Sequence, residues 1–442
     1  MTQQRSSGEI ARFVLPVVAE NAFTALVSLV YSAITGALGP GSLAAANTGN
    51  QAMNVISALF AMISTGCAIL TARLVGRKDT EGASRTAEQT LFITPVLSIV
   101  LSALLIILVT PTMRLLMPGA QGDFLREGTV YYRAVLFSVP ALVVTNACAG
   151  LLRAAGQSKT ALISTVLSNL VQLLCVFLFT SVFKMGILGV ALAMGACRLV
   201  SAVFLVTAVL KNHRGFAVDR KRMLRPDALA LSRIFRVGFP ASIDALAVQL
   251  GYVIINSMLV GMGQVHASVN SVLSSVLLFT GITQGIGSAC ATTLVGHLIG
   301  FGSVEGARRR LNQILLWCEG SSMLLCVPAV LFSGFSAGLF SKDAQVVQMA
   351  SAFMWIQIPY CMAAVGVNVC EPAVRVGGDV KFAMWNISLC VMLIRIPLTW
   401  LFCIRMKLGV HGVYWANITS LSTRFLLDYL RIRSPKWGTR EL

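Results

Sequence analysis

The segment Phe239-Pro240-Ala241-Ser242-Ile243-Asp244 places an acid four positions after a proline, at the start of a long apolar stretch. No Asp, Glu, Lys or Arg follows Asp244 until Glu305. A similar arrangement stands near the N-terminus, where Glu20 also follows a proline by four positions and precedes a charge-free run over 21–72. Because a charge in apolar surroundings is costly, both acids are candidates for a functional role.

The composition around these segments indicates a membrane protein. Of the 442 residues, 56% are hydrophobic and 12% are charged, whereas soluble proteins carry about 25% charged residues. The apolar runs are long enough to cross a bilayer, which takes about 20 residues of helix. The chain is therefore predicted to be an all-α polytopic membrane protein with about twelve transmembrane helices.

The net charge of +18 does not indicate nucleic-acid binding, because most of the 35 Lys and Arg residues fall in alternate loops between apolar runs. Such a distribution is typical of loops that stay in the cytoplasm. We expect a multi-pass protein of the plasma (cell inner) membrane, with both termini in the cytoplasm and the lipid bilayer as its surroundings.

The eleven cysteines and four histidines show no paired or metal-ligand spacing. No disulfide framework, metal site or cofactor is therefore expected. An intramembrane enzyme is a remote alternative, since no Ser/His/Asp grouping and no phosphate-binding loop is apparent.

The second half of the chain repeats the first at an offset of 222–224 positions. The matched pairs are Pro16 with Pro240, Glu20 with Asp244, Gly76 with Gly300, Glu81 with Glu305, Arg153 with Arg375, Gly156 with Gly378, Lys159 with Lys381, Gly186 with Gly409 and Gly189 with Gly412. Six spans in each half give the halves the same orientation, a common plan in transporters. The predicted organisation is an N-terminal six-helix lobe (1–210), a basic cytoplasmic linker (211–233), a C-terminal six-helix lobe (234–430) and a cytoplasmic tail (431–442).

Four loops carry a family resemblance. The segments 74–83 and 298–307 each combine a Gly-rich span exit with an acid and a small-residue helix start, and 152–156 and 374–379 each contain an Arg-x-x-Gly turn. Together these loops resemble the multidrug and toxic compound extrusion (MATE) family. The resemblance implies two pseudo-symmetric six-helix bundles around a V-shaped central cleft. It also implies export of amphipathic, often cationic, compounds driven by a proton or sodium gradient, and we expect a monomer.

Asp244 and Glu20 are the first candidates for binding the solute and the coupling ion. At matching positions of two spans, they would face each other across the cleft. The alternative is that each is an ordinary charge near the cytoplasmic end of its helix. At the position of Tyr31, many members of the family that the chain resembles carry an aspartate implicated in ion coupling. A phenol with an ordinary pKa of about 10 is a poor proton carrier, so coupling in the N-terminal lobe would rest on Glu20 or be absent.

Other polar residues in the spans leave alternatives open. Glu371 is either a second carboxylate of the C-terminal site or the i, i+4 partner of Arg375. Asn256 and Gln249 either bind solute or join helices by hydrogen bonds. Pairing is expected among further charges in apolar sequence, but the sequence does not say which pairs form: Glu319, Arg198, Arg395, Arg424 and Asp428.

These features favour a secondary active efflux transporter, an antiporter that works by alternating access and not an enzyme. The main alternative is a flippase for lipids or lipid-linked precursors from the same broader superfamily. A flippase would need a cationic cleft for phosphate headgroups, and Arg198, Arg395 and Arg424 keep this alternative open.

Overall fold

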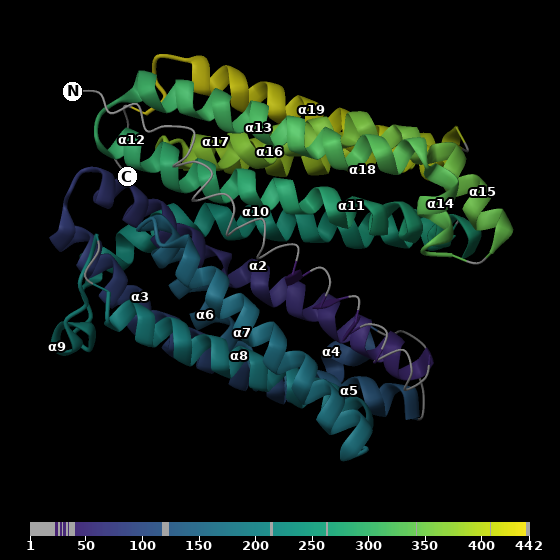
Figure 1. The fold of residues 1–442 in the computed structure, drawn as a ribbon, viewed down its shortest axis with the longest axis horizontal. Helices are drawn as coiled ribbons and strands as arrows, with labels where there is room; N and C mark the ends of the chain where they lie inside the picture. The colour runs from purple at the N-terminus through teal and green to yellow at the C-terminus, as the bar shows by residue number, and fades with distance from the viewer. Residues whose placement is uncertain are drawn as a thin grey trace. The chain divides into compact units, whose positions relative to one another are not determined.

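A computed structural model describes residues 23–24, 27–28, 30–31, 34, 40–116, 123–212, 215–261, 264–341, 343–406 and 408–438. Most of the first predicted span, with Glu20, lies outside this range. Regular structure in the described residues is entirely helical (Figure 1). The chain forms two compact units, Met1–Ser242 and Ile243–Leu442.

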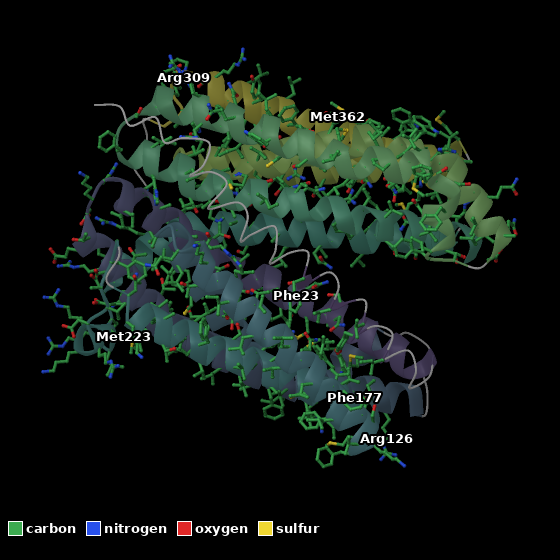
Figure 2. All side chains as sticks on the ribbon, in the orientation of Figure 1. Phe23, Arg126, Phe177, Met223, Arg309 and Met362 are labelled. Atoms are coloured by element: carbon green, nitrogen blue, oxygen red, sulfur yellow. The ribbon has the colours of Figure 1, made fainter. Side chains whose placement is uncertain are left out.

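Most of the helices before the second unit follow apolar runs of the sequence. They are α2 (Pro40–Gly76), α3 (Thr80–Ile107), α4 (Val109–Leu116), α5 (Asp123–Leu136), α6 (Val139–Ala154), α7 (Ser158–Phe177), α8 (Gly186–Leu210) and α9 (Arg220–Met223). Helix α10 (Ala228–Gly261) contains the boundary between the units and begins inside the predicted linker. Figure 2 labels Met223 of α9, which follows the exposed basic residues Arg220, Lys221 and Arg222.

The second unit continues with further helices. They are α11 (Gln264–Cys290), α12 (Gly296–Gly300), α13 (Val304–Leu331), α14 (Ser333–Gly338), α15 (Ala344–Phe353), α16 (Gln357–Val376), α17 (Val380–Leu389), α18 (Ile396–Trp400) and α19 (Val410–Arg433). Short π-helical turns interrupt several of them, at 178–182, 291–295, 390–395 and 401–405.

Eight described helical segments are long and apolar enough to cross a membrane, and a ninth span is bent by 49° between Leu136 and Val139. This bend precedes Pro140, which has no N–H group to continue the helix. Helix α19 has 24 residues, which corresponds to about 36 Å, also enough for a bilayer. Large apolar side chains on α13, such as Leu316 and Leu324, are exposed as expected for lipid contact. The predicted all-α polytopic fold is confirmed.

Helix α3 extends beyond its apolar run at the N-terminal end. Helix α3 begins at Thr80, because the side chain of Asp79 accepts a hydrogen bond of 2.8 Å from the Gly82 N–H and caps the helix. It ends at Ile107, before the separate helix α4. The polar first turns of α3 are thus helical although they are not part of an apolar run.

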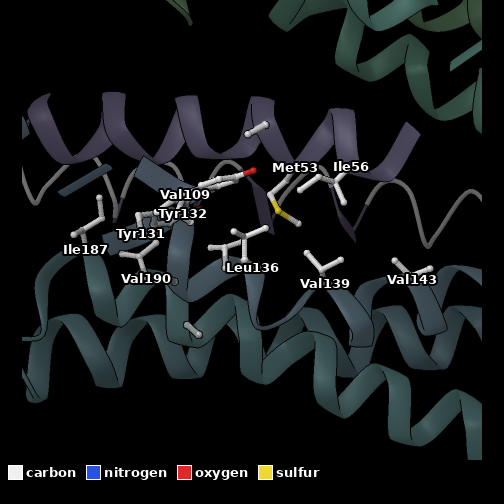
Figure 3. Packing of buried hydrophobic residues seen from close by; sticks show 14 of the residues in the cluster. Met53, Ile56, Val109, Tyr131, Tyr132, Leu136, Val139, Val143, Ile187 and Val190 are labelled. Carbon is white, nitrogen blue, oxygen red and sulfur yellow. The ribbon is translucent and has the colours of Figure 1, made fainter. Parts of the chain in front are cut away.

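Each unit is packed around one helix. In the first unit, α6 packs against α2, α3 and α8, and Figure 3 shows Met53 and Ile56 of α2 beside Tyr131, Leu136 and Val139. In the second unit, α16 packs against α11, α13 and α19. Helices α6 and α16 end in the two repeated Arg-x-x-Gly segments, 152–156 and 374–379, so the repeat places the same element at the centre of both bundles.

The repeat extends to backbone conformation. Gly156 and Gly378 have positive φ angles of 81° and 96°, and Gly186 and Gly409 have φ angles of 58° and 60°. The π-helical turn at 178–182 recurs at 401–405, at the offset of 223 that relates the glycines beyond it. Residues that match in the sequence therefore adopt matching turns.

Candidate functional site

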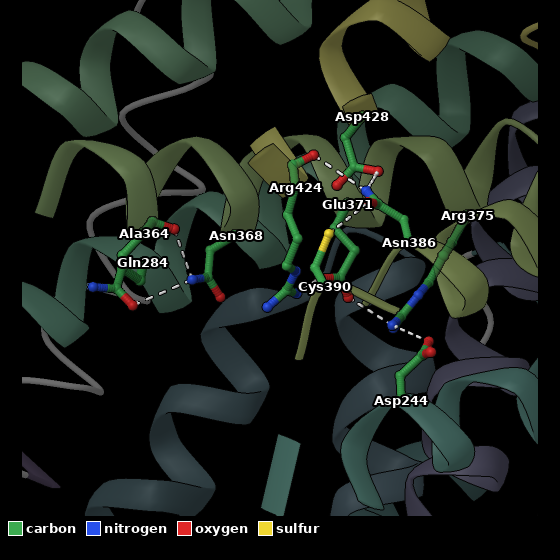
Figure 4. Close-up of polar contacts among 10 residues, drawn as sticks. All are labelled: Asp244, Gln284, Ala364, Asn368, Glu371, Arg375, Asn386, Cys390, Arg424 and Asp428. Carbon is green, nitrogen blue, oxygen red and sulfur yellow. Dashed lines mark hydrogen bonds and ion pairs between the residues drawn. The ribbon is translucent and has the colours of Figure 1, made fainter. Parts of the chain in front are cut away.

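An ion pair joins α10 to α16 inside the second unit. The Nη2 atom of Arg375 lies 2.6 Å from Oδ2 of Asp244 (Figure 4). Asp244 is only 2% exposed, and it stands eight residues after Arg236, about 12 Å along the helix. The acid singled out in the sequence is therefore a buried group with a specific partner.

The ion pair is part of a longer chain of charges. The same Nη2 atom lies 2.6 Å from Oε1 of Glu371, one turn earlier on α16, and Oε2 of Glu371 lies 2.7 Å from Nη2 of Arg424 on α19. Glu371 is thus the i, i+4 partner of Arg375 and also a link to α19. Its contacts agree with both interpretations of this residue, as a second carboxylate of the C-terminal site and as the i, i+4 partner of Arg375, because its carboxylate contacts two arginines.

A third carboxylate, Asp428, lies one helical turn beyond Arg424 and is fully buried. The amide of Asn386 donates a hydrogen bond of 2.8 Å to Oδ1 of Asp428, and the same nitrogen lies 3.2 Å from the carbonyl oxygen of Arg424. The thiol of Cys390 donates to Oδ1 of Asn386 across 3.5 Å. The two Asn386 contacts fasten α17 to α19. The hydroxyl of Ser420 on α19 donates to the carbonyl oxygen of Cys390 across 3.1 Å, which fastens the π-helical turn after α17.

The group formed by Asp244, Glu371, Asp428, Arg375 and Arg424, here called the charge network, has three carboxylates and two guanidinium groups. If all were ionised, one negative charge would be in excess. Among the described residues, Oδ1 of Asp244 and Oδ2 of Asp428 are buried without a hydrogen-bond partner. An uncompensated buried charge is costly, so the network favours uptake of one proton or one cation.

Among the described residues, Gln249 and Glu319 form no ion pair with these groups. Gln249 is half-buried on α10, and the side chain of Asn256 is outside the described residues. Glu319 of α13 is half-buried, with an Oε2 atom that has no partner in the described structure. Asn368, which was not singled out, donates a hydrogen bond of 3.2 Å to Oε1 of Gln284 (Figure 4). It joins α16 to α11.

The first unit has a different polar interior. The hydroxyl of Tyr31 lies 3.3 Å from the hydroxyl of Tyr131, which donates a hydrogen bond of 3.0 Å to Oδ1 of Asn50. Nη1 of Arg198 donates to Oγ of Ser138 across 2.7 Å. Tyr31 is therefore a buried member of a hydrogen-bonded group with Tyr131 and Asn50. Glu20 lies outside the described residues, so its roles in binding and in pairing with Asp244 stay predictions.

The structure adds residues to the site that the sequence did not assign to it. Arg375 was recognised only as part of a repeated turn and as a possible partner of Glu371, and Asn386 was not singled out. The repeat offered one signal for Arg375, because Arg153 stands at the matching position. For Asn386, no sequence signal distinguishes it from other polar residues in spans.

Known proteins resemble the chain over almost its whole length. The MatE family model matches residues 16–178 and again 240–401. A probable multidrug resistance protein NorM of Thermotoga maritima is 23% identical, over 98% of this chain and 93% of its own length. An uncharacterized transporter, YisQ, of Bacillus subtilis is also 23% identical, over 90% of this chain and 87% of its own.

Solved structures share the fold. A transporter of the MOP superfamily from Pyrococcus furiosus superposes with a TM-score of 0.87 at 21% identity, covering 96% of this chain and 94% of its own. An outward-facing multidrug resistance MATE transporter gives the same TM-score at 20% identity, with the same coverage of both chains.

A duplicated bundle of membrane-spanning helices with a buried charge network defines a membrane transporter. The family model matches both halves, and the chain belongs to the MATE family. It is therefore a transporter and not an enzyme.

Proposed function

We propose that this transporter is a secondary active exporter that exchanges protons for amphipathic, often cationic, compounds by alternating access. The observation that carries the proposal is the excess carboxylate of the charge network. One proton neutralises the network, and so does one positively charged solute group. A site that accepts either, but not both, couples their movements in opposite directions.

Asp244 is the carboxylate best placed for this exchange. Arg375 has two carboxylate partners, one on α10 and one on its own helix. When Asp244 takes a proton, Arg375 keeps its ion pair with Glu371, while the charged link between α10 and α16 is lost. A cationic solute that competes with Arg375 for Asp244 has the same effect on this link.

We infer proton rather than sodium coupling from the occupied carboxylate oxygens. Sodium needs several oxygen ligands at once, in keeping with the preference of hard cations for oxygen. In the charge network, guanidinium groups hold one oxygen of Asp244 and both oxygens of Glu371. A proton needs only one free oxygen, such as Oδ1 of Asp244.

A lipid flippase remains the second candidate, and its requirement is a cationic site. Arg424 is engaged with Glu371, and Arg198 donates to Ser138. These two contacts favour the exporter, whereas Arg395, which has no carboxylate within ion-pair distance among the described residues, is the arginine on which the flippase alternative rests. The proposal also includes a monomer in the plasma membrane with both termini in the cytoplasm.

Ethidium efflux from liposomes that contain the purified protein tests the proposal. We expect a pH gradient to drive efflux, a sodium gradient to have no effect, and Asp244→Asn to abolish the proton-driven movement. Glu305→Gln is the matched control, because it also turns an acid into an amide, at an exposed i, i+4 pair with Arg309. Efflux driven by sodium alone, or proton-driven efflux retained in Asp244→Asn, would contradict the proposed coupling.

A further inference from the structure

Arg395 differs from the arginines of the charge network. It is 8% exposed, yet in the described part of the chain no carboxylate lies within ion-pair distance of it, and its Nε atom is buried without a hydrogen-bond partner. The guanidinium carbon lies 4.4 Å from the centre of the Tyr252 ring. An arginine stays protonated in proteins, so within the described residues this charge lies against the face of Tyr252 without a carboxylate partner.

The backbone that presents Arg395 is unusual. Arg395 ends the π-helical turn Cys390–Arg395, whereas the matching part of α7 in the first half is regular α-helix. Between Lys159 and Gly186 the first half has one residue fewer than the second half has between Lys381 and Gly409. A π turn closes around one more residue than an α turn.

The extra residue of the second half is therefore accommodated within the span that carries Arg395. Such single π turns are frequent at functional sites. The neighbouring helix fits closely against this one, since a Cβ atom on Gly251 would lie 2.8 Å from Cγ1 of Val391 and 3.9 Å from Nη1 of Arg395.

The surroundings of Arg395 supply aromatic rings and hydroxyl groups. Tyr252 of α10 is 44% exposed, so the site is open on this side. The rings of Tyr360 on α16 and Tyr414 on α19 lie 5.8 Å apart in an edge-to-face arrangement. The π-helical turn that ends at Arg395 packs against α19, which carries Tyr414, and α19 packs against α16, which carries Tyr360. Phenol hydroxyls donate hydrogen bonds to carboxylates, and guanidinium groups bind them with a matching planar fork.

We propose that Arg395, with Tyr252 and the Tyr360–Tyr414 pair, binds a carboxylate of the exported solute. The inference rests on the proposed function in one respect, that the C-terminal bundle carries an organic solute. Tyr252 follows Asp244 by eight residues, about 12 Å along α10. A zwitterionic amphipathic solute can therefore place its cationic group near Asp244 and its carboxylate near Arg395, so that each buried charge has a partner of opposite charge.

Binding of two dyes tests the proposal without any gradient. A rhodamine with a free carboxylate and the methyl ester of the same dye share one delocalised cation and differ in the anionic group. Fluorescence anisotropy with the purified full-length protein in detergent gives both dissociation constants. We expect Arg395→Gln to weaken binding of the acid by about tenfold, as for loss of one charged hydrogen-bond donor, and to leave the ester unchanged. Arg395→Lys should retain part of the preference for the acid.

Arg405→Gln is the matched control. Arg405 also stacks on an aromatic ring, 5.8 Å from the centre of Trp400, but it is exposed. The Arg405→Gln variant should bind both dyes with the dissociation constants of the unaltered protein. Binding of the methyl ester also shows whether the Arg395→Gln variant has kept its fold, because the ester needs the rest of the site to bind.

Several results would overturn the proposal. They are equal affinity of the unaltered protein for acid and ester, no binding of the acid, and equal losses for both dyes in Arg395→Gln. Displacement of the acid by phosphatidylglycerol but not by phosphatidylcholine would also overturn it, by assigning the site to a lipid phosphate. Failure of the gradient experiment with Asp244→Asn would leave this binding difference intact, so the two proposals fail separately.

Discussion

Arg375 donates one short hydrogen bond, 2.6 Å long, to Asp244 and holds a second carboxylate, that of Glu371, at the same distance. A guanidinium with two acidic partners can release one of them and keep an ion pair with the other. Arg375 keeps a carboxylate partner when Asp244 is substituted, whereas Asp244 loses its described ion-pair partner when Arg375 is substituted. Substitutions at the two ends of the ion pair should therefore differ in their effect on stability.

Arg375→Met should destabilise the protein more than Asp244→Asn. Loss of the arginine leaves Asp244 buried without a cation and leaves Glu371 with Arg424 alone, and removal of one partner from a buried pair costs about 3–5 kcal/mol. Asp244→Asn removes a charge but keeps a hydrogen-bonding group. Thermal unfolding in detergent measures the difference, with the exposed Arg309→Gln as control. A smaller loss in Arg375→Met than in Asp244→Asn would show that the pair does not stabilise the bundle.

Asn386→Leu should destabilise the second unit by about 1–3 kcal/mol, since it leaves the buried Asp428 without its hydrogen-bond donor. Adding Asp428→Leu should recover part of this loss, because both polar partners are then absent. Unfolding measurements on the two single variants and the double variant give a coupling energy, expected to exceed about 0.5 kcal/mol for residues in contact. Strict additivity would contradict the contact between α17 and α19.

Tyr31→Phe should retain proton-driven ethidium efflux within about twofold. It removes the hydroxyl contact with Tyr131, at a net cost of about 1 kcal/mol, but no group that carries charge at neutral pH. Parallel efflux assays with Asp244→Asn provide the comparison. If Tyr31→Phe abolished coupling while the protein stayed folded, the proton path would have to include the first unit.

Gly189→Ala and Gly412→Ala should destabilise the protein by similar amounts, about 1–3 kcal/mol for an overpacked position. A Cβ atom would lie 2.9 Å from Cβ of Phe179 in the first case and 2.8 Å from Cβ of Phe402 in the second. These are matching contacts of the repeat. Gly320→Ala on α13 is the control, because a Cβ there meets no atom within 4 Å, and alanine favours helix. Thermal unfolding of all three variants tests the equivalence.

Much of the fold follows from linear features of the chain. Apolar run length sets the number of spans, because each helix must satisfy its own backbone in lipid. The duplication is visible at single positions, such as Gly156 with Gly378 and Gly186 with Gly409, because turns that need positive φ tolerate few residues other than glycine. The ends of helices are harder to predict from hydropathy. The start of α3 at Thr80, for example, depends on the capping hydrogen bond of Asp79, which a hydropathy profile does not show.

The sequence by itself determined the class of protein and its duplication, and it singled out Asp244 as a candidate, because the cost of a charge in an apolar segment depends mainly on its near neighbours in the chain. Only the tertiary structure decided that Asp244 pairs with Arg375, that Glu371 joins two arginines and that Arg395 faces Tyr252. Asp244 and Arg375 are 131 positions apart, and an ion pair at that separation exists only once α10 has packed against α16. Pairing therefore depends on how helices meet, which hydropathy along one chain does not encode.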